Sequence, residues 1–146
     1  MKFLPFVLLI VFAACKKDST PSTTELISQT WSFQKKTLIS SVQGTVFEGN
    51  TTESFAFDHC YVGPDQVFNP DGSFENGVSA ECSLQFRGTW NYQPSDKMIN
   101  VHFMDGFEDF RYYLVDVSPN KLKVQRWESF GPAAPELLFQ YEFIKK

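Results

Sequence analysis

The sequence predicts an all-β fold, an antiparallel up-and-down (meander) β-barrel of about eight strands. From Trp31 onward, apolar and polar residues alternate with a period of two, which is typical of strands with one buried face. Turn signals rich in Pro, Gly, Asn and Asp separate the alternating runs. No strand–helix–strand pattern appears, which argues against a parallel sheet. Closing a meander into a barrel removes its exposed edges.

The composition is that of one folded domain. The chain has 146 residues, a formal net charge of −4, 42% hydrophobic residues and 21% charged residues. A chain of this size can bury its own core, and this balance differs from that of a disordered protein. The acidic net charge argues against nucleic acid as a partner, because binding phosphate requires a basic face.

The first residues have the pattern of an export signal. Lys2 is followed by an uncharged run from Phe3 to Ala14, which is too short for a hydrocarbon core of about 30 Å and is typical of a signal peptide. Small residues before Cys15 resemble a bacterial lipobox, which implies an acylated cysteine held in the lipid bilayer. The alternative is an ordinary signal peptide with an incidental cysteine.

Three regions follow from this assignment. Residues 1–14 are the lipoprotein signal peptide, residues 15–25 are the lipidated cysteine and a flexible polar tether, and residues 26–146 form the barrel domain. Several acyl chains would anchor the protein stably. We expect it in the cell envelope, at the outer membrane.

Two further cysteines agree with this location. The envelope is oxidising, so Cys60 and Cys82 are expected to form a disulfide, which would contribute about 3 kcal/mol. The alternative is a metal site that adds His59 and Asp58. However, the neighbours His59 and Cys60 would face opposite sides of a strand. We therefore expect neither a metal nor a cofactor.

The elements of the first half are less regular than those of the second. A brief helix is expected within Thr23 to Gln29. The strand after it carries apolar residues on one face, interrupted by a lysine, in the order Trp31, Phe33, Lys35 and Ile39. Residues 44–64 are expected to form one strand and a long loop. Val67 and Phe68 then lead through a turn at 69–72 into a strand with Phe74.

Five more strands follow, each with apolar residues at alternate positions. Turn signals at 93–96, 105–106 and 118–120 separate them, and a loop with glycine and prolines at 131–135 precedes the last. The alternating apolar positions are Leu84, Phe86, Trp90 and Tyr92; Ile99, Val101 and Phe103; Phe110, Tyr112 and Leu114; Leu122 and Val124; and Leu137, Phe139, Tyr141 and Phe143.

Several motifs, in this order, resemble the lipocalin-like lipoproteins of Bacteroidetes. They are Leu26 to Trp31, the turn 69–72 with its flanking cysteines, the strand Gly88-Thr89-Trp90-Asn91-Tyr92, and Lys97-Met98-Ile99. The resemblance covers about residues 26–145. It implies a lipocalin-like, calycin-type barrel with a cup for a small apolar ligand.

The inward-facing side chains either pack a solid core or line such a cup. The ligand-binding candidates are Arg126, Tyr112, Tyr141, Phe86, Trp90, Phe103 and Phe139. Arg126 shares the parity of Leu122 and Val124, so it could pair with a ligand carboxylate, as in the related fatty-acid-binding proteins. Alternatively, it stacks over Trp31 and closes the barrel's base, as a late-strand arginine does in lipocalins.

Three side chains bear on the choice between a solid core and a ligand cup. Lys35 lies on the same face of its strand as Trp31. It is either a second inward cation or marks the solvent-exposed end of the strand. Tyr112 and Tyr141 could donate hydrogen bonds to the same head group.

The sequence offers little support for catalysis. It lacks the Gly-x-Ser-x-Gly, His-Glu-x-x-His and phosphate-loop motifs, and His102 falls on the polar face of its strand. The acidic residues Asp105, Glu108 and Asp109 are expected in a solvated loop rather than on Ca²⁺.

We therefore expect a non-enzymatic, membrane-anchored protein that binds a small hydrophobic or amphipathic ligand. The alternative is an interaction protein of the envelope, with a solid barrel that acts through its outer surface. The sequence does not specify a protein partner.

Overall fold

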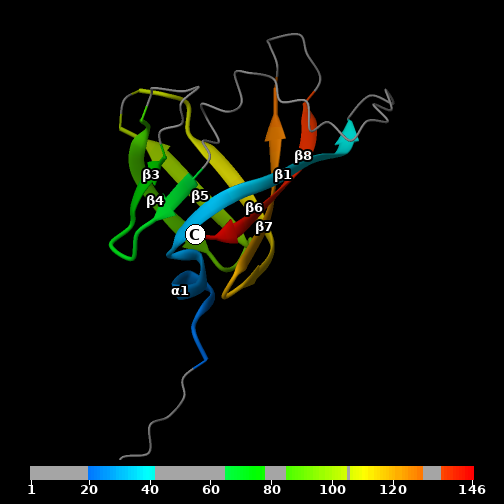
Figure 1. The fold of residues 1–146 in the computed structure, drawn as a ribbon. Coiled ribbons are helices and arrows are strands. Elements are labelled where there is room, and N and C mark those ends of the chain that lie inside the picture. The colour runs from blue at the N-terminus through cyan, green and yellow to red at the C-terminus, as the bar shows by residue number, and fades with distance from the viewer. Residues whose placement is uncertain (1–19, 42–64, 78–84, 105, 130–135) are drawn as a thin grey trace, which may run out of the picture.

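Eight antiparallel strands form a closed barrel in chain order, with β8 paired to β1, in a computed structural model (Figure 1). The structure describes residues 20–41, 65–77, 85–104, 106–129 and 136–146. The strands are β1 (Thr30–Ser41), β2 (Asp65–Phe68), β3 (Ser73–Asn76), β4 (Arg87–Gln93), β5 (Met98–Phe103), β6 (Phe110–Ser118), β7 (Lys121–Glu128) and β8 (Leu137–Lys145). This topology confirms the predicted meander barrel.

Some predictions fall outside the described residues. These are the signal peptide, the lipidation of Cys15, the Cys60–Cys82 pairing, the alternative ligands His59 and Asp58, and the strand and loop at 44–64. Within the described part, no helix is long and apolar enough to cross a membrane.

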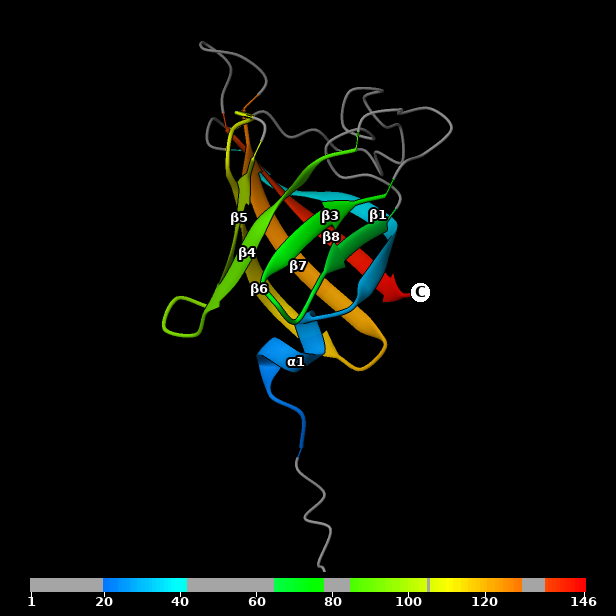
Figure 2. The same ribbon diagram turned by 90° about the vertical axis from the view of Figure 1, so that its left-hand side faces the viewer.

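A short helix, α1 (Thr23–Ile27), lies beneath one end of the barrel (Figure 2). It begins inside the segment predicted to be a tether, because Ser22 and Glu25 form a capping box. The Ser22 hydroxyl accepts from the Glu25 N–H at 3.2 Å, and the Glu25 carboxylate accepts from the Ser22 N–H at 2.6 Å. We call this end of the barrel the base, and the opposite end, where β7 ends and β8 begins, the far end.

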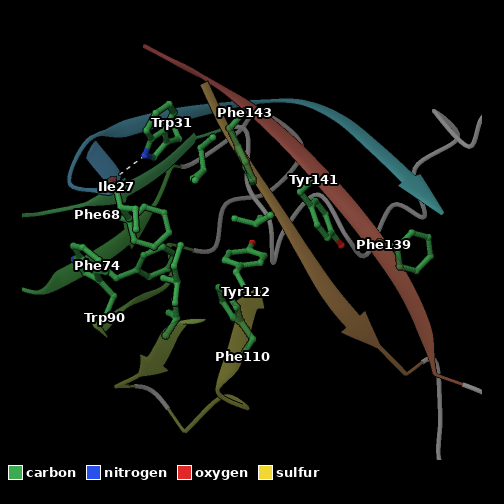
Figure 3. Packing of buried hydrophobic residues seen from close by; sticks show 14 residues of the cluster. Ile27, Trp31, Phe68, Phe74, Trp90, Phe110, Tyr112, Phe139, Tyr141 and Phe143 are labelled. Carbon is green, nitrogen blue, oxygen red and sulfur yellow. Dashed lines mark hydrogen bonds between the residues drawn. The ribbon is translucent and has the colours of Figure 1, made fainter. Parts of the chain in front are cut away.

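The base is packed with large apolar side chains. Trp31 is fully buried, and its indole N–H donates to the backbone oxygen of Ile27 at 2.8 Å (Figure 3). Four further side chains there are at most 1% exposed, namely Phe68, Phe74, Leu122 and Phe143. The indole hydrogen bond ties the short helix to the first strand, which explains how so short a helix persists.

Strand β1 departs from the simple alternation that the sequence suggested. Its pairing with β8 shifts register between Phe33 and Lys35, and again between Leu38 and Ser40. A β-bulge adds one residue to a strand and moves the following side chains to the opposite face. Lys35 is therefore exposed and Ile39 is 45% exposed. The expectation that Ile39 shares the buried face of Trp31 is wrong, and of the two alternatives for Lys35 the inward cation is wrong.

Candidate functional site

Polar side chains of several described strands point into the barrel, and we call six of them, from five strands, the inner polar cluster. Its members are Lys36 of β1, Gln66 of β2, Tyr112 of β6, Arg126 and Glu128 of β7, and Tyr141 of β8. On β7 the inward positions pass from apolar residues near the base to charged residues toward the far end, in the order Leu122, Val124, Arg126 and Glu128.

Lys36 and Glu128 form an ion pair inside the barrel. The Lys36 Nζ lies 2.8 Å from the Glu128 carboxylate, and the two side chains are only 13% and 7% exposed. The ammonium also lies over aromatic faces, 4.0 Å from the Phe139 ring centroid and 5.4 Å from that of Tyr141. These contacts offset part of the cost of removing the two charges from water.

Arg126 is held against an aromatic ring within the barrel. Its guanidinium carbon lies 4.6 Å from the Phe110 ring centroid, and in the β7–β8 ladder it pairs with Phe139. The expected alternative partner, Trp31, instead belongs to the base, where it pairs with Gln66 and Lys145. Arg126 thus points inward, as predicted. The ring beneath its guanidinium is that of Phe110, not that of Trp31.

Tyr112 is buried at the centre of the cluster. Its hydroxyl accepts a hydrogen bond from the Gln66 Nε2 at 2.9 Å. Burial raises the pKa of this hydroxyl above its ordinary value of 10.0, although the nearby Arg126 charge acts in the opposite direction. Tyr112 therefore stays a neutral hydrogen-bonding group at physiological pH.

Tyr141 differs from Tyr112 in the state of its hydroxyl. The side chain is fully buried, and within the described part of the chain its oxygen has no hydrogen-bond partner. Leaving such a group unsatisfied costs about 1–3 kcal/mol. The Lys36 ammonium lies 5.4 Å from the centroid of the same ring.

The predicted aromatic candidates do not all lie together. Phe139 is part of the site through Lys36 and Arg126, and Phe103 reaches it through Phe110, with ring centroids 5.4 Å apart. Phe86 lies beside Phe103 at 5.5 Å.

Trp90 belongs to the base. Its indole N–H donates to the Asn69 oxygen at 2.9 Å, and its ring packs on Phe68. In Figure 3 it lies beside Phe74, on the side of the cluster away from Tyr141 and Phe139.

The sequence reasoning missed Lys36, Gln66 and Glu128. Glu128 could have been found, because it continues the alternation of Val124 and Arg126 by one more step. Lys36 could not, because the bulge before it reverses the parity of β1. The signal for Gln66 is its place two residues before Phe68, on the same face of β2.

The predicted surface groups lie away from this site. His102 is exposed, and its Nδ1 lies 2.7 Å from the Asp109 carboxylate. The hydrogen bond with His102 lowers the pKa of Asp109, which also accepts from the Phe103 N–H. Among the described residues, no three His, Cys, Asp or Glu side chains gather as metal ligands would.

Comparison with known proteins finds a likeness to a solved structure. No protein-family model matches the chain, and no curated protein matches it. The crystal structure of a DUF4847 family protein from Bacteroides vulgatus covers 83% of this chain and 94% of its own, with 16% sequence identity and a TM-score of 0.48.

Proposed function

We propose that the protein is a membrane-anchored lipoprotein of the cell envelope, lipocalin-like in kind, whose barrel binds a small hydrophobic or amphipathic ligand. The supporting observation is the inner polar cluster itself: two cations, one acid and a buried hydroxyl without a partner in the described chain, set among aromatic rings. Ligand sites combine such apolar walls with a few polar groups that fix orientation.

The energetics favour a binding role over a purely structural one. A buried ion pair stabilises a fold weakly, since desolvation of both charges opposes their attraction. A solid barrel would be served as well by apolar side chains at positions 36 and 128. The partly exposed inner residues Leu38, Phe103 and Leu137 leave an apolar wall near the same groups.

The first experiment is native mass spectrometry of the protein purified from its own envelope, with lipids extracted in parallel. We expect a reproducible additional mass of a few hundred daltons beyond the anchor. The extracted compound should bind again to the purified barrel.

The matched variant for this experiment is Arg126→Gln, with Lys123→Gln on the outer face of the same strand as control. We expect Arg126→Gln to weaken rebinding of an anionic cargo about tenfold, and Lys123→Gln to leave it unchanged. A bare mass from the envelope, together with no rebinding of any extracted lipid, would contradict the proposal.

A second function is favoured by the outer surface. Tyr113, Val115 and Trp127, on the neighbouring strands β6 and β7, are 40%, 47% and 39% exposed. Such residues suit a protein partner. If the barrel acts through this face, Trp127→Ala should abolish recovery of an envelope protein by cross-linking. Arg126→Gln should leave that recovery unchanged.

A further inference from the structure

The inner polar cluster carries one more cation than acid. Lys36 and Arg126 supply two positive charges, and Glu128 supplies one negative charge. Glu128 lies within hydrogen-bond distance of Lys36, whereas Arg126 lies over the Phe110 ring and beside the Tyr112 hydroxyl. Within the described set, the positive charges thus outnumber the negative charges by one, which favours an anion nearby.

Lys36 is held in place by more than its carboxylate partner. The Phe139 ring lies 4.0 Å beneath the ammonium, and Tyr141 lies slightly farther away. Cation–π contacts of this kind persist whichever anion is paired with the ammonium. The position of the Lys36 charge therefore does not depend on Glu128 alone.

Glu128 lies at the end of its strand, with a side chain that is 7% exposed. It is the last residue of β7, at the far end of the barrel, and it pairs with Leu137, the first residue of β8. Arg126 and Lys36 lie within their strands. A carboxylate at the strand end can turn into water, and its hydration then offsets the lost ion pair.

We propose that Glu128 is an internal counter-ion, which the anionic head group of an amphipathic ligand replaces at Lys36. This inference rests on the proposed ligand-binding function. The ligand class is a singly charged anionic amphipath, such as a carboxylate or sulfonate with an apolar body. Its head group would contact Lys36 and Arg126 and accept a hydrogen bond from the Tyr141 hydroxyl.

The test uses two fluorescent probes that differ mainly in charge. 1-Anilinonaphthalene-8-sulfonate carries one negative charge, and N-phenyl-1-naphthylamine is its uncharged counterpart. Both probes are titrated into the full mature protein, as the wild-type chain and as each variant. The ratio of the two dissociation constants isolates the contribution of the head group.

Removing the Glu128 carboxylate, which competes with the probe for Lys36, should strengthen binding of the anionic probe only. Glu128→Gln is expected to tighten binding of the sulfonate about tenfold and to leave the uncharged probe unchanged. Lys36→Met is expected to weaken the sulfonate by a similar factor.

Glu142→Gln is the matched control. Glu142 pairs with Lys121 and Lys123, at 3.4 and 3.8 Å, on the outside of the barrel. This substitution should change the dissociation constant of neither probe.

The outcomes separate the two proposals. If the uncharged probe binds but Glu128→Gln leaves sulfonate binding equal or weaker, the counter-ion role is wrong and ligand binding stands. If neither probe binds any variant, ligand binding fails and the counter-ion role falls with it. Should Glu128→Gln not fold, Glu128→Asp replaces it. The shorter side chain of aspartate lies farther from Lys36, so this variant should tighten sulfonate binding by a smaller factor. A loss of sulfonate affinity in this variant would again overturn the inference.

Discussion

Two buried tyrosines in the barrel show how much a single neighbour matters. Tyr112 receives a hydrogen bond from Gln66, whereas the Tyr141 hydroxyl has no partner in the described chain. The two rings are 6.0 Å apart, so both hydroxyl groups lie in the same interior. The hydrogen-bonding capacity of Tyr112 is thus used within the cluster, whereas that of Tyr141 is not used by any described residue.

Burial of Tyr112 predicts its behaviour in alkali. Because the pKa of Tyr112 is raised, the folded chain keeps this proton while the unfolded chain loses it. Stability should therefore fall as the pH rises above about 10. In a tyrosinate absorbance titration of the native protein, Tyr112→Phe should match the wild type until unfolding begins.

The exposed neighbour Tyr113 is the matched control for this titration. Tyr113→Phe should reduce the tyrosinate signal of the native protein, because its hydroxyl meets water. If Tyr112→Phe reduced the native signal as much, the raised pKa of Tyr112 would be incorrect.

At the scale of the elements, strand β4 approaches β5 closely at one residue. A Cβ built on Gly88 would lie 2.0 Å from the backbone oxygen of His102 and 2.9 Å from its carbonyl carbon. Both atoms belong to the backbone of the paired strand, so neither can move without separating the ladder. Glycine is required there for space.

Gly88→Ala is therefore expected to lower the free energy of unfolding by about 3 kcal/mol or more, measured by urea denaturation. Thr89→Ala, at the exposed neighbouring position, should change it by less than about 1 kcal/mol. Equal unfolding midpoints for the two variants would show that the strands separate without cost.

The sequence predicted the later elements better than the first strand. The alternation is regular in β7, in most of β8 and from Phe110 to Leu114, with one register shift in β6 after Leu114, and it identified the barrel and the inward direction of Arg126. Strand β1 carries two register shifts, and no residue type in the sequence indicates their positions. The ion pair of Lys36 with Glu128 joins residues 92 positions apart, so it could emerge only from the closed barrel.

At the scale of the whole molecule, the chain enters the barrel at the base. Residues 16–22 separate Cys15 from α1 and can span at most roughly 25 Å when fully extended. An acylated Cys15 would therefore keep the base close to the bilayer, and the far end with Glu128 would face away from it.

This anchor predicts a clear result from labelling. When cells are grown with an alkyne analogue of palmitate, Cys15→Ser should abolish the label on the protein and release it from the membrane fraction. The variants Cys60→Ser and Cys82→Ser, which keep the lipidation site, should retain the label. Persistent labelling of Cys15→Ser would contradict the lipoprotein assignment.

The pairing of β1 with β8 has a consequence for the biogenesis of the protein. The longest strand finds its partner only after nearly all of the chain has been made, since Trp31 pairs with Lys145. Until then the nascent sheet has two open edges, which are available to other chains. A chain cut before β8 would offer β1 and β7 to chaperones or aggregates.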